Sequence, residues 1–128
     1  MREDAGRFEI GNYNLADIHA LDAALDLIAG VGVANIERHV LALGDRLIER
    51  MDALGVRLVG PRERARRAHI YVLDLPVEQW VGFLAQHGVR VSPERDGVRI
   101  SFGLFNTPDD VDRVAGIIAA GLQAPVSA

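Results

Sequence analysis

Apolar residues recur at helical spacing through the first half of the chain, in two series. The first series comprises Leu15, Ile18, Leu21, Leu25 and Ile28. It predicts a helix that begins after Asn14, a good N-cap, and ends at Gly30 and Gly32. The second series comprises Val33, Ile36, Val40, Leu43, Leu47, Met51 and Leu54. It predicts a longer amphipathic helix with Gly55 as its C-cap.

From residue 56 onward the apolar positions recur with a period near two, which is typical of strands. Strands are expected at residues 56–59, 69–75, 89–92 and 98–104. A helix between Pro76 and Gly88 interrupts them, and the Asp96-Gly97 pair favours a tight reversal before the last strand. A final helix places its apolar residues on one face, namely Val111, Val114, Ile118 and Leu122.

This order of elements predicts an α+β fold. Two helices come first and strands interleaved with helices follow, which favours two layers: a small, mainly antiparallel sheet with helices packed on one face. A ferredoxin-like sandwich fits the same order equally well. Along the chain we expect an opening loop over 1–14, one domain over 15–123 and a frayed tail over 124–128.

The stretch that joins the last strand to the last helix is the most informative part of the sequence. Apolar and polar positions alternate from 98 to 104, so Arg99 is expected to point away from the apolar side of its strand. The helix then begins with Thr107 as N-cap, Pro108 in the first position and Asp110 in the first turn, where a carboxylate suits the positive helix end. An arginine on the open side of a strand either forms ordinary surface ion pairs or binds a carboxylate.

Charge and hydropathy exclude several classes of partner. The chain has 14 basic and 18 acidic residues, a formal net charge of -4 and 49% apolar residues. This balance gives no electrostatic reason to expect nucleic acid or an anionic membrane surface as a partner. No apolar run is long enough to cross a bilayer, and the charged residues 2–4 lead into no signal-peptide core, so a cytoplasmic location is expected.

The stretch around Arg99 resembles the end of the class V aminotransferase family, the pyridoxal-phosphate (PLP) enzymes that include cysteine desulfurases, selenocysteine lyases and isopenicillin-N-epimerase-like proteins. The matching residues are Arg99, Ser101, Phe105, Asn106, Thr107, Asp109, Asp110, Val111 and Asp112. Phe105 stands where tyrosine is commoner in the family. Residues 7–14 resemble the segment that opens the same domain, with Asn12 in place of a threonine. Two further parts of the chain resemble family segments. One is Gly32-Val33 followed by Ile36 and His39, and the other is the stretch 88–92.

This resemblance implies the C-terminal small domain of a fold type I PLP enzyme, acting on an amino acid as an aminotransferase, epimerase or lyase. Arg99 would then bind the substrate carboxylate. Gly11 and Asn12 fall in the loop that, in relatives, reaches the PLP phosphate of the other subunit of a homodimer. The chain is therefore expected to be a fragment whose missing partner is the N-terminal large domain that binds PLP.

Two residue types are absent from the chain. All 14 basic residues are arginine, so the chain has no lysine amine to hold PLP as a Schiff base, and arginine cannot replace it because it stays protonated. We therefore expect no catalytic residue and no activity from this chain alone. The chain also has no cysteine, so the persulfide chemistry of the cysteine desulfurases is not expected.

The remaining charged and histidine residues have simpler explanations. The arginines at 62, 64, 66 and 67, with Glu63 among them, predict a solvated loop rather than an anion site. The four histidines lack a second ligand at metal-binding spacing, so structural roles and no metal site are expected. The alternative hypothesis for the whole chain is a free-standing, dimeric α+β module that binds a small acidic ligand at Arg99.

Overall fold

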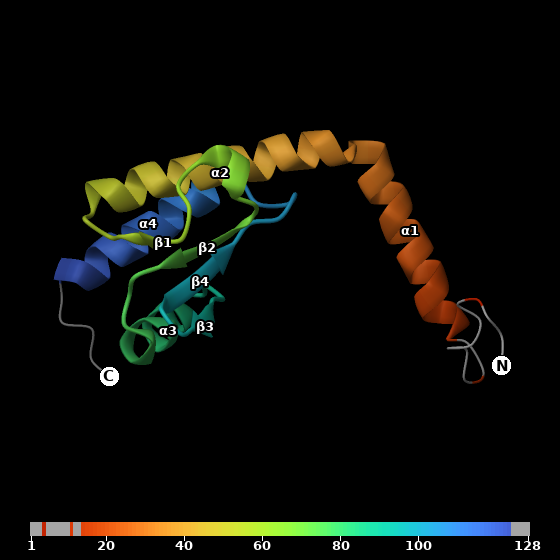
Figure 1. The fold of residues 1–128 in the computed structure, drawn as a ribbon. Helices are drawn as coiled ribbons and strands as arrows, with labels where there is room; N and C mark the ends of the chain where they lie inside the picture. Colours follow the sequence, from red (N-terminus) through yellow and green to blue (C-terminus); the bar gives the residue numbers. More distant parts are fainter. Residues whose placement is uncertain (1–3, 5–10, 12–13, 124–128) are drawn as a thin grey trace. The chain divides into compact units, whose positions relative to one another are not determined.

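The computed structural model describes residues 4, 11 and 14–123, and these form two compact units (Figure 1). The first unit spans Met1–Val33 and the second spans Ala34–Ala128. The sequence favours an opening loop over 1–14, one domain over 15–123 and a tail over 124–128. This division stays a prediction.

The first unit contains one long helix, α1 (Leu15–Val31). The Asn14 side-chain oxygen accepts a hydrogen bond from the Asp17 backbone N–H at 3.3 Å, so the predicted N-cap is confirmed. The helix continues through Gly30 and ends at Gly32, whose φ of 85° suits glycine. No residue of α1 is buried against the described part of the chain, although the helix is mostly apolar.

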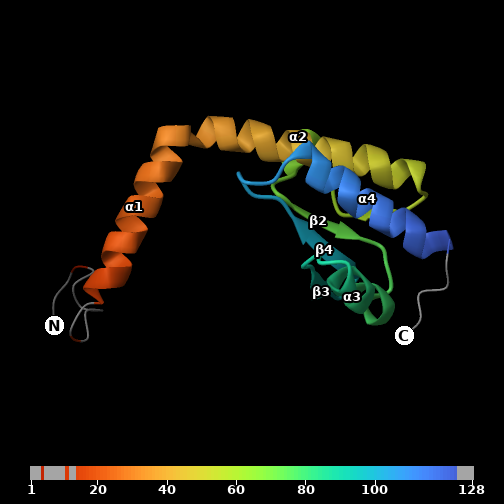
Figure 2. The ribbon, with the colours of Figure 1, turned by 180° about the vertical axis from the view of Figure 1, so that it is seen from behind.

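The second unit is an α+β fold, as predicted. Its elements are α2 (Val33–Ala53, all but the first residue), β1 (Leu58–Val59), the short 3-10 helix η2 (Arg64–Arg66), β2 (Ile70–Leu73), α3 (Val77–Gln86), β3 (Ser92–Glu94), β4 (Gly97–Ser101) and α4 (Pro108–Gln123). The four strands of the described residues form one sheet in the order β1-β2-β4-β3, and every neighbouring pair is antiparallel. Figures 1 and 2 show α2 and α4 side by side along this sheet.

One face of the sheet carries the core. Alternate residues of β2 and β4 are buried under the helices, among them Tyr71, Leu73, Val98 and Ile100. The helices contribute further fully buried side chains, namely Leu47, Met51, Leu84, Val111 and Ile118. On the opposite face, Ile70, Val72, Arg99 and Ser101 are exposed or half-buried, so this part of the sheet is open to a ligand or to another polypeptide.

Several predicted strand boundaries are wrong, and β2 (Ile70–Leu73) is shorter than predicted at both ends. Residues 89–91 form no strand, because the Val89 N–H completes the end of α3 by bonding to the Leu84 carbonyl at 2.9 Å. Strand β3 instead begins at Ser92 and includes Pro93, which the edge of the sheet tolerates because an edge strand need not donate on its outer side. Strand β4 ends at Ser101, three residues earlier than expected, and β1 contains only two residues.

Within the described residues, none of the helices combines the length and the hydropathy that a bilayer span needs.

Candidate functional site

Arg99 lies in the middle of β4, on the open face of the sheet. Its strand neighbours Val98 and Ile100 are buried, whereas 41% of the Arg99 side chain is exposed, which confirms the predicted orientation. The strand register places Val72 of β2 opposite Arg99 on one side and Ser92 of β3 opposite it on the other. The guanidinium therefore lies on a flat surface with an apolar side chain and a hydroxyl as neighbours.

The β3–β4 hairpin supplies both polar partners of this guanidinium. Arg99 Nη1 donates to Glu94 Oε1 at 2.8 Å, and Nη2 donates to Ser92 Oγ at 3.1 Å. Glu94 pairs with Gly97 across the hairpin, so its side chain reaches Arg99 diagonally. The Glu94 side chain is 40% exposed, so the ion pair is open to solvent and a soluble carboxylate has access to it.

The loop after β4 is fixed by a reciprocal cap of α4. The Thr107 backbone N–H donates to Asp110 Oδ2 at 2.7 Å, and the Asp110 N–H donates to Thr107 Oγ1 at 3.4 Å. The hydrogen bond from the Thr107 backbone is the main reason that the pKa of Asp110 lies below its usual range. The N-cap expected at Thr107 is confirmed, while the Phe105 side chain of the same loop is 80% exposed.

His39 connects this loop to α2. Its Nε2 lies 2.8 Å from the Asn106 carbonyl oxygen, so Nε2 is the protonated nitrogen that donates. The Asn106 side-chain oxygen in turn accepts from the Gly103 N–H at 2.8 Å. His39 therefore makes a structural contact between α2 and this loop, and no sequence pattern indicates this particular partner.

Asp112 joins α2 to α4, and the sequence analysis assigned it no role. Arg46 Nε and Arg50 Nε donate to Asp112 Oδ1 at 2.9 and 3.0 Å, and Arg46 Nη2 bonds to Oδ2. The pKa of Asp112 is lowered to about 2. The hydrogen bonds from Arg46 are the largest cause, and the hydrogen bond from Arg50 is a smaller one. These three residues, the Asp112 cluster, hold the start of α4 against α2. They thereby also hold the end of the loop that joins β4 to α4.

We expect the Asp112 cluster to make stability sensitive to acid. The folded pKa of about 2 lies below the ordinary value of 3.8, so the cluster's contribution is present above pH 3.8 and is lost as the pH falls towards 2. Urea denaturation of wild type and Asp112→Asn at several pH values should show a stability difference at pH 6 that shrinks below pH 4. Asp96→Asn, which changes an exposed hairpin carboxylate, is the control. A difference that stays constant down to pH 2 would contradict the assignment.

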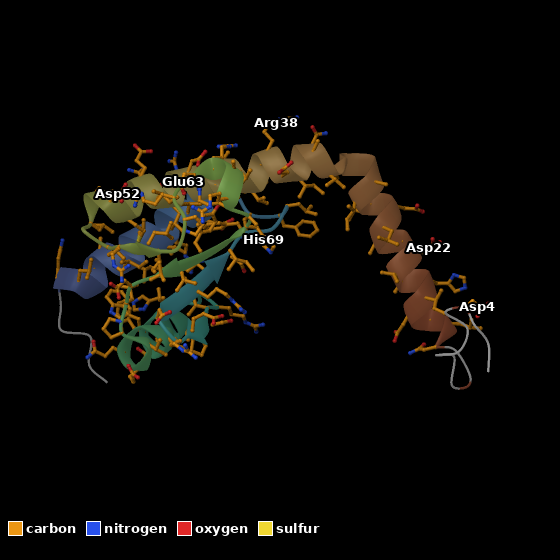
Figure 3. All side chains as sticks on the ribbon, viewed as in Figure 1. Asp4, Asp22, Arg38, Asp52, Glu63 and His69 are labelled. Carbon is orange, nitrogen blue, oxygen red and sulfur yellow. The ribbon has the colours of Figure 1, made fainter. Side chains whose placement is uncertain are left out.

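The arginine-rich loop is more ordered than predicted. Arg62 pairs with Asp52 of α2, and Arg64 and Arg67 both pair with Asp45 of the same helix. Asp52 and the neighbouring Glu63 are labelled in Figure 3. Only 6% of the Arg67 side chain is exposed, so the expectation of a wholly solvated loop is wrong at this residue. A buried arginine needs an acidic partner, and that partner lies 22 residues away in the sequence.

Gly11, Asn12 and three of the histidines form no part of the hairpin of Arg99. Gly11 belongs to the first unit, where it forms an exposed bend with a φ of 154°, and Asn12 lies outside the described residues. His87 Nδ1 lies 2.9 Å from the Phe83 carbonyl oxygen, and His19 and His69 are exposed, of which His69 is labelled in Figure 3. Across residues 4, 11 and 14–123, His and acidic side chains nowhere gather in a group of three that could hold a metal ion.

Comparison with known proteins agrees with this geometry at the level of the fold. A cysteine desulfurase from Thermococcus onnurineus, solved in its apo form, superposes with a TM-score of 0.88 over 96% of this chain and 35% of its own. The sequence identity is 24%, so this likeness establishes the fold alone. The sheet with its helices on one face thus matches part of a cysteine desulfurase fold.

The sequence comparison establishes the family. Residues 1–114 match the aminotransferase class-V family, and the chain belongs to that family. An uncharacterized protein of Schizosaccharomyces pombe, C11D3.10, is 37% identical over 121 residues, which are 94% of this chain and 28% of the relative. An uncharacterized aminotransferase of the same yeast, C777.03c, is 35% identical over 92% of this chain and 30% of its own length. The chain therefore spans less than a third of these curated relatives.

The family uses PLP, and the residues of this chain do not by themselves provide a complete site for it. The covalent attachment needs a lysine amine, and the chain has none. Of the two residues expected near the phosphate, Gly11 is exposed and offers only its backbone. Arg99, by contrast, has the chemistry of a carboxylate-binding group and lies where a ligand can approach it.

Proposed function

We propose that this chain is the substrate-carboxylate-binding small domain of a PLP-dependent enzyme of the class V aminotransferase family. The observation that carries the proposal is the Arg99 site, where two terminal guanidinium nitrogens meet a carboxylate and a hydroxyl on an open sheet face. The planar guanidinium can bind a carboxylate in a bidentate manner, which fixes the orientation of an amino acid. The reaction would be a transamination, an epimerisation or an elimination.

The Schiff-base lysine would come from a large domain that this chain lacks. The length of the curated relatives, more than three times that of this chain, supports a partner of that size. The chain alone would then be inactive, and in the intact enzyme PLP would supply the electron sink for chemistry at the amino-acid Cα. Arg99 would hold the carboxylate, and the loop at Gly11 and Asn12 would face the phosphate bound by the other subunit of a homodimer.

Helix α1 supports the presence of this large partner. Its apolar side chains are exposed by roughly a third to two thirds, namely Leu15, Ile18, Leu21, Leu25, Leu27, Ile28 and Val31. They surround most of the helix. Its polar side chains are Asp17 in the first turn and a narrow strip with His19, Asp22 and Asp26, of which Asp22 is labelled in Figure 3. A helix that is apolar almost all round belongs inside a larger protein. We propose that the rest of such an enzyme packs against the apolar side chains of α1.

Cysteine desulfuration by this chain is not part of the proposal. The Thermococcus protein carries that name, but this chain has no cysteine to accept sulfur. Strands β3 and β4 are joined by a turn of only two residues, Arg95 and Asp96. The proposed reaction is therefore one that proceeds by proton transfer at the substrate Cα.

We expect Arg99→Ala to abolish carboxylate binding by the 128-residue chain. Removing the guanidinium removes both donors, whereas Arg95→Ala removes an exposed arginine of the same hairpin and serves as the matched control. Titration of ¹⁵N-labelled protein with L-asparagine, followed by NMR, should shift the Arg99 side-chain and hairpin signals in wild type and Arg95→Ala only. Equal shifts of the hairpin signals in all three proteins would refute the assignment of Arg99.

A further inference from the structure

Arg99 is not empty in the free chain, because a carboxylate of the same hairpin already binds it. Glu94 Oε1 accepts from Arg99 Nη1 at 2.8 Å and leaves Nη2 to the Ser92 hydroxyl at 3.1 Å. A ligand that binds Arg99 through both nitrogens must displace Glu94 from Nη1. Glu94 is then a tethered competitor for the ligand carboxylate.

Displaced Glu94 cannot move far from the site. Strand β3 holds it through the pairing of Pro93 with Val98 and of Glu94 itself with Gly97, and the connecting turn has only two residues. Neither position directly opposite Arg99 offers a second cation, since these positions hold Val72 of β2 and Ser92 of β3. A bound ligand therefore meets the Glu94 charge a few ångströms from its own.

We propose that Glu94 determines the specificity of the Arg99 site, by disfavouring ligands that carry a second carboxylate. This inference rests on the proposed function. Like charges held close together destabilise each other, whereas an uncharged or cationic ligand side chain meets no such penalty. The substrate class is then amino acids with neutral or basic side chains rather than aspartate or glutamate.

The structure sets the size of the effect. Both members of the Arg99–Glu94 pair are about 40% exposed, and exposed charges interact only modestly in water. Replacing Glu94 by glutamine keeps the shape of the side chain and removes its charge. We expect Glu94→Gln to tighten L-asparagine binding about twofold by relieving the competition, and L-aspartate binding about fivefold by relieving the repulsion as well.

The experiment compares two isosteric ligands on the full 128-residue chain. L-asparagine and L-aspartate are titrated at pH 7 and constant ionic strength, with the Arg99 Nε–H signal as the readout. The proteins are wild type, Glu94→Gln, Glu94→Ala and the control Asp96→Asn, which removes one negative charge from the same hairpin at a residue that does not pair with Arg99. Constant ionic strength prevents simple screening from imitating selectivity.

The expected result is a ratio of aspartate to asparagine affinity that rises about two- to threefold in both Glu94 variants and stays at the wild-type value in Asp96→Asn. An unchanged ratio in the Glu94 variants, with asparagine still bound, would overturn this inference and leave the proposed function standing. An equal rise in Asp96→Asn would overturn it too, because the effect would then be a general one of net charge. If the Arg99 signal responds to neither ligand in any protein, both the inference and the proposed function fail.

Discussion

Replacing Gly97 with alanine is expected to lower the free energy of unfolding of the second unit by about 3 kcal/mol or more. Gly97 has a φ of 148°, a conformation that residues with a side chain rarely adopt. A β-carbon built there overlaps the backbone carbonyl of Leu73 on the neighbouring strand β2. Backbone atoms of a central strand cannot rotate away as a side chain can, so the β2–β4 pairing must open. Urea denaturation followed by circular dichroism measures the loss.

The Gly97 substitution also tests the candidate site, because the same residue sets the hairpin register. Gly97 pairs with Glu94 and lies two residues before Arg99, so opening the strand pairing separates Arg99 from its hairpin partners. Gly82→Ala is the matched control, since that glycine of α3 has open space around its Cα and should gain about 0.5–1 kcal/mol from alanine. A Gly97→Ala protein as stable as wild type would show that the close approach to Leu73 is not a feature of the folded chain.

The helices and the orientation of Arg99 were predictable because they depend on local periodicity. The apolar spacing of α2 and α4 and the cap at Thr107 are properties of contiguous sequence, and each is confirmed. The alternation around Arg99 likewise determines which face it occupies without any knowledge of the neighbouring strands.

The partners of Arg99 were not predicted, although a local signal was present. The predicted strands end at 92 and begin at 98, which leaves a connection of five residues, whereas the turn contains only Arg95 and Asp96. A two-residue turn fixes the register, which places Ser92 opposite Arg99 and Glu94 diagonally from it. A two-residue turn at Arg95 and Asp96 is therefore enough to predict the ion pair between Arg99 and Glu94.

Other contacts had no signal in the sequence. Arg67 is buried against Asp45, and Asp112 bonds to Arg46 across two helices, because the fold brings together residues that are 22 and 66 positions apart. Charged residues at such separations have many possible partners, and only the packing of α2 against the loop and α4 selects one. The periodicity of α1 similarly predicted a helix with an apolar surface but not what covers it.

Gly44→Ala is expected to destabilise the second unit by about 2–3 kcal/mol, even though alanine is the better helix former. Gly44 is buried in α2, and a β-carbon there overlaps the phenol ring of Tyr71, of which only 2% is exposed. The ring cannot turn aside freely, since it lies 6.1 Å from Phe102 and under the Arg67 guanidinium. Burial also raises the pKa of Tyr71, so ionisation of the phenol in the variant at a lower pH would report that the ring has moved outward.

Gly116→Ala is the control that separates packing from helix propensity. Gly116 lies in α4 with open space around its Cα, so alanine there should stabilise by about 0.5–1 kcal/mol. Thermal unfolding should therefore place the two alanine variants on opposite sides of wild type. A Gly44→Ala protein that melts with or above Gly116→Ala would mean that α2 does not pack closely on Tyr71, and the position of β2 beneath α2, on which the Arg99 face depends, would have to be revised.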